Sequence, residues 1–228
     1  MKIFNSLKNL TLSAGLILIT AASLSSCSKD DDNNGVFGDA HVRVVNTVEG
    51  SASQDLYVDD TKVTSSAVAY AENSDFTEVR TGDRKATFHN SGSTDVNTSF
   101  DLSLDIGKYY TVYYTADGSS KTSFVTEEDM SAPASGKAKV RFVHLSSAAA
   151  SKIDLAIANG EKIFTDLAYR TASAYKEVDA NASFKLYTSG SSTIGLNIPT
   201  SLEAGKIYVI YFTGNTAANF SFHVVKEN

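Results

Sequence analysis

The chain has 228 residues, of which 42% are hydrophobic and 20% charged, and its 20 Lys and Arg against 26 Asp and Glu give a formal net charge of −6. This length allows one large domain or two small ones, and the composition excludes a collagen-like, disulfide-dense or wholly disordered chain. The acidic balance argues against a nucleic-acid-binding protein, since phosphate contacts need a face rich in Lys and Arg.

Residues 1–26 predict a lipoprotein signal peptide. After a start that carries two lysines comes an apolar stretch of signal-peptide length, shorter than the ~20 residues that span a bilayer. It ends in Leu24-Ser25-Ser26-Cys27, which resembles the lipobox of bacterial lipoproteins. The resemblance implies cleavage before Cys27, the only cysteine, and attachment of lipid to its thiol. The alternative is an ordinary secretory signal or a transmembrane anchor with an incidental cysteine.

The lipid-bearing Cys27 is followed by a short polar segment, and residues 27–35 together predict a disordered tether. Within it, Lys29 followed by Asp30, Asp31 and Asp32 resembles the export signal of surface lipoproteins in one phylum of Gram-negative bacteria. That resemblance implies an outer-membrane protein that faces the cell exterior. The alternative is a plain polar spacer, which is commonly rich in Asp and Asn.

The rest of the chain consists of two copies of one sequence unit. Shifts of 98 or 99 residues align segments of one half with the other half in the same order, which excludes a chance match. We expect domains at residues 36–131 (repeat 1) and 137–228 (repeat 2), joined by a linker at residues 132–136. The aligned segments are 40–46 with 138–144, 55–58 with 154–157, 76–79 with 175–178, and 104–110 with 202–208.

Each repeat has the pattern of short β-strands separated by turn residues. Side chains alternate along the strands, so Val42 and Val44 share a predicted core face, as do Tyr110 and Val112. About 95 residues per repeat predict two tandem antiparallel β-sandwiches, immunoglobulin-like only in general architecture because the Cys…Trp…Cys signature is missing. The expected strands are at residues 41–46, 55–58, 86–89, 100–104, 108–115 and 122–126, with 206–213 and 220–225 as counterparts of the last two.

The order of these elements resembles a known family. An opening Val-Arg-Val/Phe-Val-Asn/His strand is followed by Asp-Leu-x-Val/Ile, Leu/Val-Ala-Tyr, an aromatic-x-Glu-Val segment and a Gly-Lys-x-Tyr strand. This framework resembles the domain of unknown function 4397, which occurs in tandem in secreted and lipid-anchored bacterial proteins. The resemblance covers residues 40–116 and 138–214. It implies an extracytoplasmic β-sandwich with no established chemistry.

Few residues have the spacing that catalysis or metal binding requires. The four histidines are scattered, and His144 is better interpreted as a core imidazole bonded to the backbone. The acidic runs at residues 59–60 and 127–129 lack the pattern of a calcium loop and are expected to be solvated turns. Asp55 and Asp154 recur in both repeats and are predicted to bond a neighbouring turn. No catalytic residue, metal or cofactor is expected.

Tyrosine is the one unusual feature of the composition, with 11 Tyr and no Trp. Tyr109 and Tyr113 point away from the predicted core face, so they are candidates for an exposed aromatic contact with a sugar or a protein. The alternative, which we favour, is that this face packs on a neighbouring strand or on the other repeat.

The sequence therefore favours a non-enzymatic surface lipoprotein that serves adhesion or ligand presentation. Its expected partners are the membrane, through the lipid anchor, and a glycan or protein at the cell surface. The alternative is a structural subunit of an outer-membrane assembly. An enzyme acting on polysaccharide is less favoured, since it would need two carboxylates ~5–9.5 Å apart in a cleft.

Overall fold

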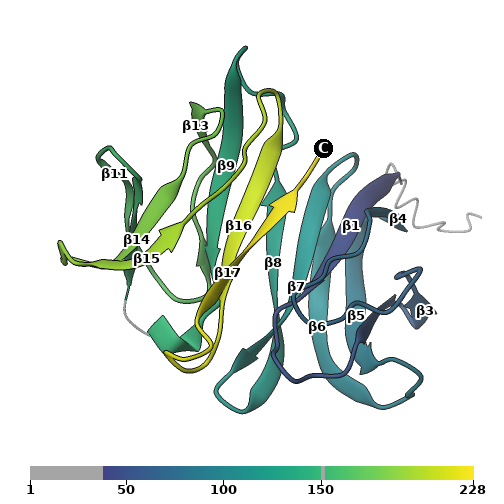
Figure 1. The fold of residues 1–228 in the computed structure, drawn as a ribbon. Coiled ribbons are helices and arrows are strands. Elements are labelled where there is room, and N and C mark those ends of the chain that lie inside the picture. The colour runs from purple at the N-terminus through teal and green to yellow at the C-terminus, as the bar shows by residue number, and fades with distance from the viewer. Residues whose placement is uncertain (1–37, 150–151) are drawn as a thin grey trace, which may run out of the picture. The chain divides into compact units, whose positions relative to one another are not determined.

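The computed structural model describes residues 38–149 and 152–228, all within one compact unit, Val36–Asn228 (Figure 1). These residues form β-strands and one short 3₁₀ helix, η1 (Ser147–Ala149). Within the described ranges, no helix is long and apolar enough to cross a membrane.

Repeat 1 consists of two four-stranded sheets. We name the first, which faces repeat 2, inner sheet 1, and the second outer sheet 1. Inner sheet 1 has the order β4 (Thr77–Arg80), β1 (Asp39–Asn46), β7 (Tyr109–Asp117), β8 (Ser120–Glu128). Outer sheet 1 has the order β3 (Thr61–Lys62), β2 (Gln54–Val58), β5 (Gly82–Asn90), β6 (Val96–Leu104).

Repeat 2 has the same order of strands. In inner sheet 2, β9 (Lys137–His144) takes the place of β1. It pairs on one side with β12 (Thr171–Ala172) and β13 (Lys176–Asp179), and on the other with β16 (Ile207–Thr213), which is followed by β17 (Ser221–Lys226). Outer sheet 2 has the order β11 (Lys162–Leu167), β10 (Ile153–Ile157), β14 (Phe184–Thr188), β15 (Ile194–Ile198).

The predicted all-β sandwich architecture is confirmed, but the expectation of purely antiparallel sheets is wrong at one strand pair in each repeat. Strand β1 runs parallel to β7, and β9 runs parallel to β16. Parallel neighbours need a long crossover connection. Here the intervening chain of each repeat supplies it, because it forms the outer sheet and an edge of the inner sheet before it reaches β7 or β16.

Each repeat has its own hydrophobic core between its inner and outer sheets. The predicted alternation is confirmed: Val42 and Val44 of β1, and Tyr110, Val112 and Tyr114 of β7, lie in the first core with Leu56 and Phe88 of the outer sheet. In the second core, Phe142 of β9 packs with its centroid 5.1 Å from that of Phe184 on β14.

A third cluster of buried side chains lies between the two inner sheets. It joins Val45 and Tyr113 of repeat 1 to Val143, Val209 and Tyr211 of repeat 2. These residues alternate along β1, β7, β9 and β16 with the residues of the two cores, so both faces of these four central strands are buried. In Figure 1, β8 and β17 mark the edges of the two inner sheets.

The turns before β7 and β16 confirm the repeat at the level of backbone conformation. Gly107 and Gly205 both have left-handed φ angles, +70° and +81°. A residue with a Cβ is strained in this region. The Gly-Lys pair that precedes each strand therefore marks the same turn in both repeats.

Candidate functional site

The predictions that concern the anchor lie outside the described residues. They are the lipidation of Cys27, the lipobox residues Leu24 to Ser26, and the export-signal-like segment Lys29 to Asp32. They stay predictions, and their test is biochemical.

The aromatic contact predicted at Tyr113 is wrong, because this side chain is fully buried between the inner sheets. Its ring centroid lies 6.1 Å from that of Tyr211 in repeat 2. Burial raises the pKa of the Tyr113 hydroxyl well above its usual value. Tyr109 is half-buried; its ring stacks on His41 at 4.3 Å and meets Phe76 edge-on at 5.1 Å. The favoured alternative, burial against the other repeat, holds for Tyr113.

His144 has the structural role that the sequence favoured. It is buried at the end of β9, and its Nε2 lies 3.0 Å from the carbonyl oxygen of Ala149. The equivalent residue in repeat 1, Asn46, is also buried and bonds the loop after its strand, donating to the Ser51 hydroxyl at 3.0 Å. Both side chains therefore fix a loop that follows the first strand of their repeat.

The two acidic runs were expected to be solvated turns, and one buried glutamate departs from this expectation. Asp59 and Asp60 form the turn between β2 and β3 with positive φ angles of 47° and 62°. Glu127 and Asp129 are exposed, but Glu128 is buried between the repeats, so the prediction of a solvated turn is wrong for Glu128. The reason is its position at the end of β8, which packs against repeat 2. No group of three or more His, Cys, Asp or Glu residues suitable for a metal was found in the described part of the chain.

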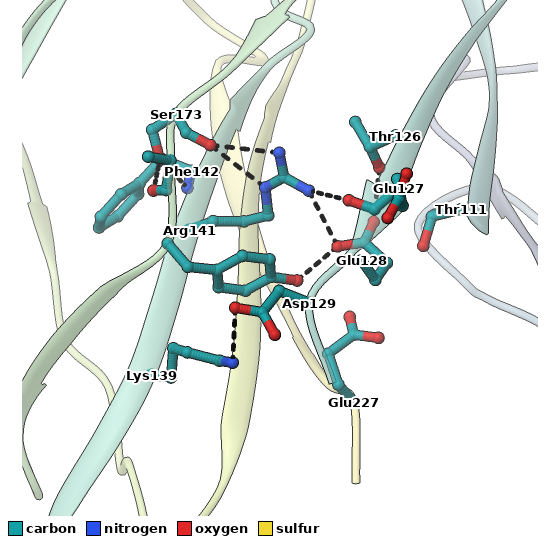
Figure 2. A network of polar contacts seen from close by, with 12 residues as sticks. Thr111, Thr126, Glu127, Glu128, Asp129, Lys139, Arg141, Phe142, Ser173 and Glu227 are labelled. Atoms are coloured by element: carbon teal, nitrogen blue, oxygen red, sulfur yellow. Dashed lines mark hydrogen bonds and ion pairs between the residues drawn. The ribbon is translucent and has the colours of Figure 1, made fainter. Parts of the chain in front are cut away.

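Glu128 is the centre of a polar network between the repeats (Figure 2). Its Oε2 accepts a hydrogen bond from Arg141 Nη1 at 3.1 Å and a short one from the Tyr175 hydroxyl. Its Oε1 accepts a bond from the Thr126 hydroxyl at 2.5 Å. Arg141 also donates to the backbone carbonyl of Ser173, and its guanidinium lies 4.8 Å from the centroid of the Tyr175 ring. Burial and the Glu128 carboxylate raise the pKa of the Tyr175 hydroxyl.

A second ion pair crosses the same interface. Arg43 Nη2 lies 2.5 Å from Glu227 Oε1, and both side chains are buried, at 3% and 0% exposure. Arg43 also donates to the Thr111 hydroxyl at 3.1 Å and lies 4.6 Å over the Phe76 ring. Burial raises the pKa of the Glu227 carboxyl to about 6, and the nearby Arg43 charge offsets this effect only in part.

Asp55 and Asp154 bond neighbouring turns, as predicted. Asp154 accepts hydrogen bonds from the amides of Asp166 and Gly190 at 2.9 and 3.2 Å. Asp55 accepts one from the Thr64 hydroxyl at 3.2 Å. Burial opposes ionisation of Asp154, but the ion pair with Lys162 and the two amides outweigh it and lower its pKa.

Aromatic rings lie beside both aspartates on the outward faces of the outer sheets. His89 stands opposite Asp55 in the strand register, and Tyr187 stands opposite Asp154 at the equivalent position of repeat 2. Both rings are half-exposed and point away from the cores, since their neighbours Phe88 and Leu186 point inward. His89 adjoins Tyr57, with 4.6 Å between the ring centroids, and Lys162 lies 5.3 Å from the centroid of Tyr187.

A lysine completes each of these outward positions. Lys62 Nζ lies 2.9 Å from Asp55 in repeat 1, and Lys162 Nζ lies 2.8 Å from Asp154 in repeat 2. Each outer sheet therefore presents a half-exposed ring next to a Lys–Asp ion pair whose lysine is partly exposed.

Sequence reasoning missed the ion pairs between the repeats and the outer aromatic positions. A signal for the first was available: Arg43 and Arg141 are charged residues at the same position of otherwise apolar strands in both repeats. For the second, His89 and Tyr187 align at a shift of 98 residues, but their residue types differ.

Comparison with protein families identifies the chain. The profile of the family described as Domain of unknown function (DUF4397) matches residues 40–156, just over half of the sequence. The chain belongs to the DUF4397 family. The matched region of this DUF4397 protein contains all strands of repeat 1 and continues through β9 into β10 of repeat 2. The resemblance inferred from the ordered motifs is thereby confirmed.

Other comparisons add little to the DUF4397 assignment. No curated protein matches the chain. Among solved structures it is similar to a family 26 carbohydrate-binding module of Eubacterium rectale Amy13K, solved with maltoheptaose, at 14% identity and a TM-score of 0.27, covering 82% of this chain and 96% of that one. It is also similar to the Bacillus anthracis TIE protein, at 9% identity and a TM-score of 0.23, covering 79% and 34%. Such low TM-scores carry no argument about the ligand.

Proposed function

We propose that this DUF4397 protein is a lipid-anchored, non-enzymatic binding protein on the outer face of the outer membrane, and that its outer sheets contact the ligand. The central strands of the inner sheets are unsuited to ligand contact, because both of their faces are buried. The outer sheets keep one face toward solvent. The proposed anchor is Cys27, with the segment Lys29 to Asp32 as the signal for surface display.

The observation that carries the proposal is the repeated outward position that His89 and Tyr187 occupy. Each combines a half-exposed aromatic ring with a Lys–Asp ion pair, and it occurs at equivalent places on two separate sheets. An aromatic ring gives apolar contact area, while the ammonium and carboxylate groups offer hydrogen bonds at its rim. This combination suits a saccharide, whose ring has an apolar face and hydroxyl groups at its edge.

The binding half of the proposal is tested on an array of immobilised oligosaccharides with residues 28–228. We expect binding to at least one saccharide, weakened about fivefold or more by His89→Ala or Tyr187→Ala, since each removes a stacking ring worth roughly 1 kcal/mol or more. Tyr109→Ala is the matched control, since it removes a half-buried tyrosine from another surface. Binding to no saccharide, or loss of binding only in the control variant, would refute the assignment.

The anchoring half is tested by protease treatment of intact cells. The wild-type protein should be membrane-bound and degraded by external protease. A Cys27→Ala variant should lose its membrane attachment, and neutralisation of Asp30 to Asp32 should leave the protein attached but protected. If the Cys27→Ala variant stays in the membrane fraction, the lipid anchor is refuted.

A further inference from the structure

The two repeats contribute equivalent residues to the interface between the inner sheets. The shift of 98 residues that aligns the two repeats takes Tyr113 to Tyr211 and Val45 to Val143, and all four lie in the cluster between the sheets. The same shift takes Arg43 to Arg141, and a shift of 99 takes Glu128 to Glu227. Each repeat therefore brings an equivalent set of side chains to the interface.

These equivalent side chains contact one another reciprocally. Arg43 of repeat 1 pairs with Glu227 of repeat 2, at 2.5 Å, and Arg141 of repeat 2 pairs with Glu128 of repeat 1, at 3.1 Å. Each arginine also lies over an aromatic ring of its own repeat, Phe76 or Tyr175, and these two rings are equivalent as well. The ion pairs thus obey the rule of a two-fold interface, although both partners belong to one chain.

The hydroxyls of two equivalent tyrosines also cross the interface, with partners that are offset by one residue in the alignment of the repeats. The Tyr70 hydroxyl of repeat 1 lies 3.1 Å from the Thr213 hydroxyl of repeat 2. At the equivalent position of repeat 2, the Tyr169 hydroxyl donates to the carbonyl of Ala116 in repeat 1 at 2.6 Å, one residue beyond Thr115, the equivalent of Thr213. An interface in which residue i contacts j while the equivalent of j contacts the equivalent of i is isologous, the type found in symmetric dimers.

We propose that the inner face of each repeat also recognises the inner face of a second copy of this chain. In such a dimer, repeat 1 of one molecule packs on repeat 2 of the other, and both ion pairs re-form between the molecules. The contacts are the same as within one chain, so the two arrangements differ only in effective concentration and in the path of the connection between Glu128 and Lys137. Dimers are therefore favoured where copies are concentrated.

The reciprocal charges select a second copy over an unrelated partner. A partner without the reciprocal charges would leave Arg43 or Glu128 buried without a counter-charge, which is strongly unfavourable. The closed interface is also incompletely bonded among the described residues, since three buried atoms there have no hydrogen-bond partner: Arg43 Nε, Glu227 Oε2 and the hydroxyl of Tyr211. Buried groups of this kind lower the stability of the closed interface and so ease its opening and exchange; because the contacts are the same in the dimer, they do not choose between the two arrangements.

The test exploits the reciprocal charges, with residues 28–228 as the protein. Variant X carries Arg43→Glu and variant Y carries Glu227→Arg, so each alone brings two like charges together in the closed chain and in its own dimer. Mixed one to one, repeat 1 of X fits repeat 2 of Y with a Glu–Arg pair, and repeat 1 of Y fits repeat 2 of X with the native pair. The matched control is the double variant with both changes in one chain, which restores the pair internally.

We expect native mass spectrometry to detect a dimer of twice the chain mass, containing one X and one Y, only in the mixture. The double variant should stay monomeric, alone and mixed with wild type. If the single variants are insoluble, X and Y are refolded together from urea, and their joint yield should exceed the sum of the separate yields severalfold. Folded X and Y that stay monomeric when mixed, or no gain on joint refolding, would overturn the proposal.

Discussion

The ion pair between Arg141 and Glu128 gives the most direct test of how the repeats are held together. The Glu128 side chain is 0% exposed and that of Arg141 is 12% exposed. Arg141→Ala removes the guanidinium and leaves a buried carboxylate with only the hydroxyls of Thr126 and Tyr175 as partners. Removing one member of a buried pair costs about 3–5 kcal/mol, and because two hydrogen bonds remain we expect about 3 kcal/mol.

The measurements are equilibrium unfolding in urea, which gives the free energy of unfolding, and thermal unfolding, both with residues 28–228. For a unit of this size, a loss of about 3 kcal/mol lowers the melting temperature by roughly 6–12 °C. The matched control is Lys137→Ala, which breaks a pair with Asp179 whose side chains are 43% and 85% exposed, and which should change stability by about 0.5 kcal/mol or less.

A double variant separates the charge effect from packing. Arg141→Met with Glu128→Gln removes both charges, keeps the volume, and should be far less destabilising than Arg141→Ala, since replacing both members of a buried pair is often close to neutral. If Arg141→Ala costs less than about 1 kcal/mol, or if the double variant is the less stable of the two, Glu128 is not a buried charge that depends on Arg141.

Three further predictions concern pH, packing and backbone conformation. The pKa of Glu227 is raised from 4.5 to about 6 in the folded protein, so the folded state binds the proton more tightly than the unfolded state does. Protonation therefore stabilises the folded state by about 2 kcal/mol. This stabilisation is full below pH 4.5 and is lost as the pH rises through 6. Unfolding measured from pH 4 to 7 should show this slope, and Glu227→Gln should remove it. Phe142→Ala should cost about 3–5 kcal/mol in urea unfolding, because this fully buried ring fills the second core; a cost under about 1 kcal/mol would contradict that packing. Gly107→Ala should cost about 1–2 kcal/mol by thermal unfolding, because its positive φ strains a residue with a Cβ, and Gly214→Ala should cost more. Both glycines have positive φ, but a Cβ at Gly214 would lie 2.5 Å from the carbonyl oxygen of Asn219, whereas at Gly107 it meets open space. Equal costs would refute the clash.

The sequence predicted the parts of the fold that depend on local patterns. Alternation along β1 assigned Val42 and Val44 to a core, because the side chains of a strand alternate between its two faces. The shift of 98 or 99 residues assigned the equivalent strands of repeat 2, because an internal repeat can be detected in the sequence alone. The role of Arg43 was not predictable in this way. Its burial depends on a face of repeat 2 that is distant in sequence, which alternation along β1 does not reveal.

The same limit applies to the site. The fate of Tyr113 depended on what covers the far side of β7, which alternation cannot tell. The parallel pairing of β1 with β7 was missed because strand direction depends on the path of the intervening chain. The outward positions of His89 and Tyr187 emerged only once the register set them beside Asp55 and Asp154.

The pair of Arg43 and Glu227 has a consequence for the order of events in folding. It joins two residues 184 positions apart, so a growing polypeptide cannot neutralise the guanidinium of its first strand until residue 227 has been made. Repeat 1 has a core of its own, but until that moment the Arg43 side chain on its inner face lacks its counter-charge. A chain cut short before residue 227 would therefore bury the Arg43 guanidinium without a counter-charge, and we expect its two repeats to separate more easily.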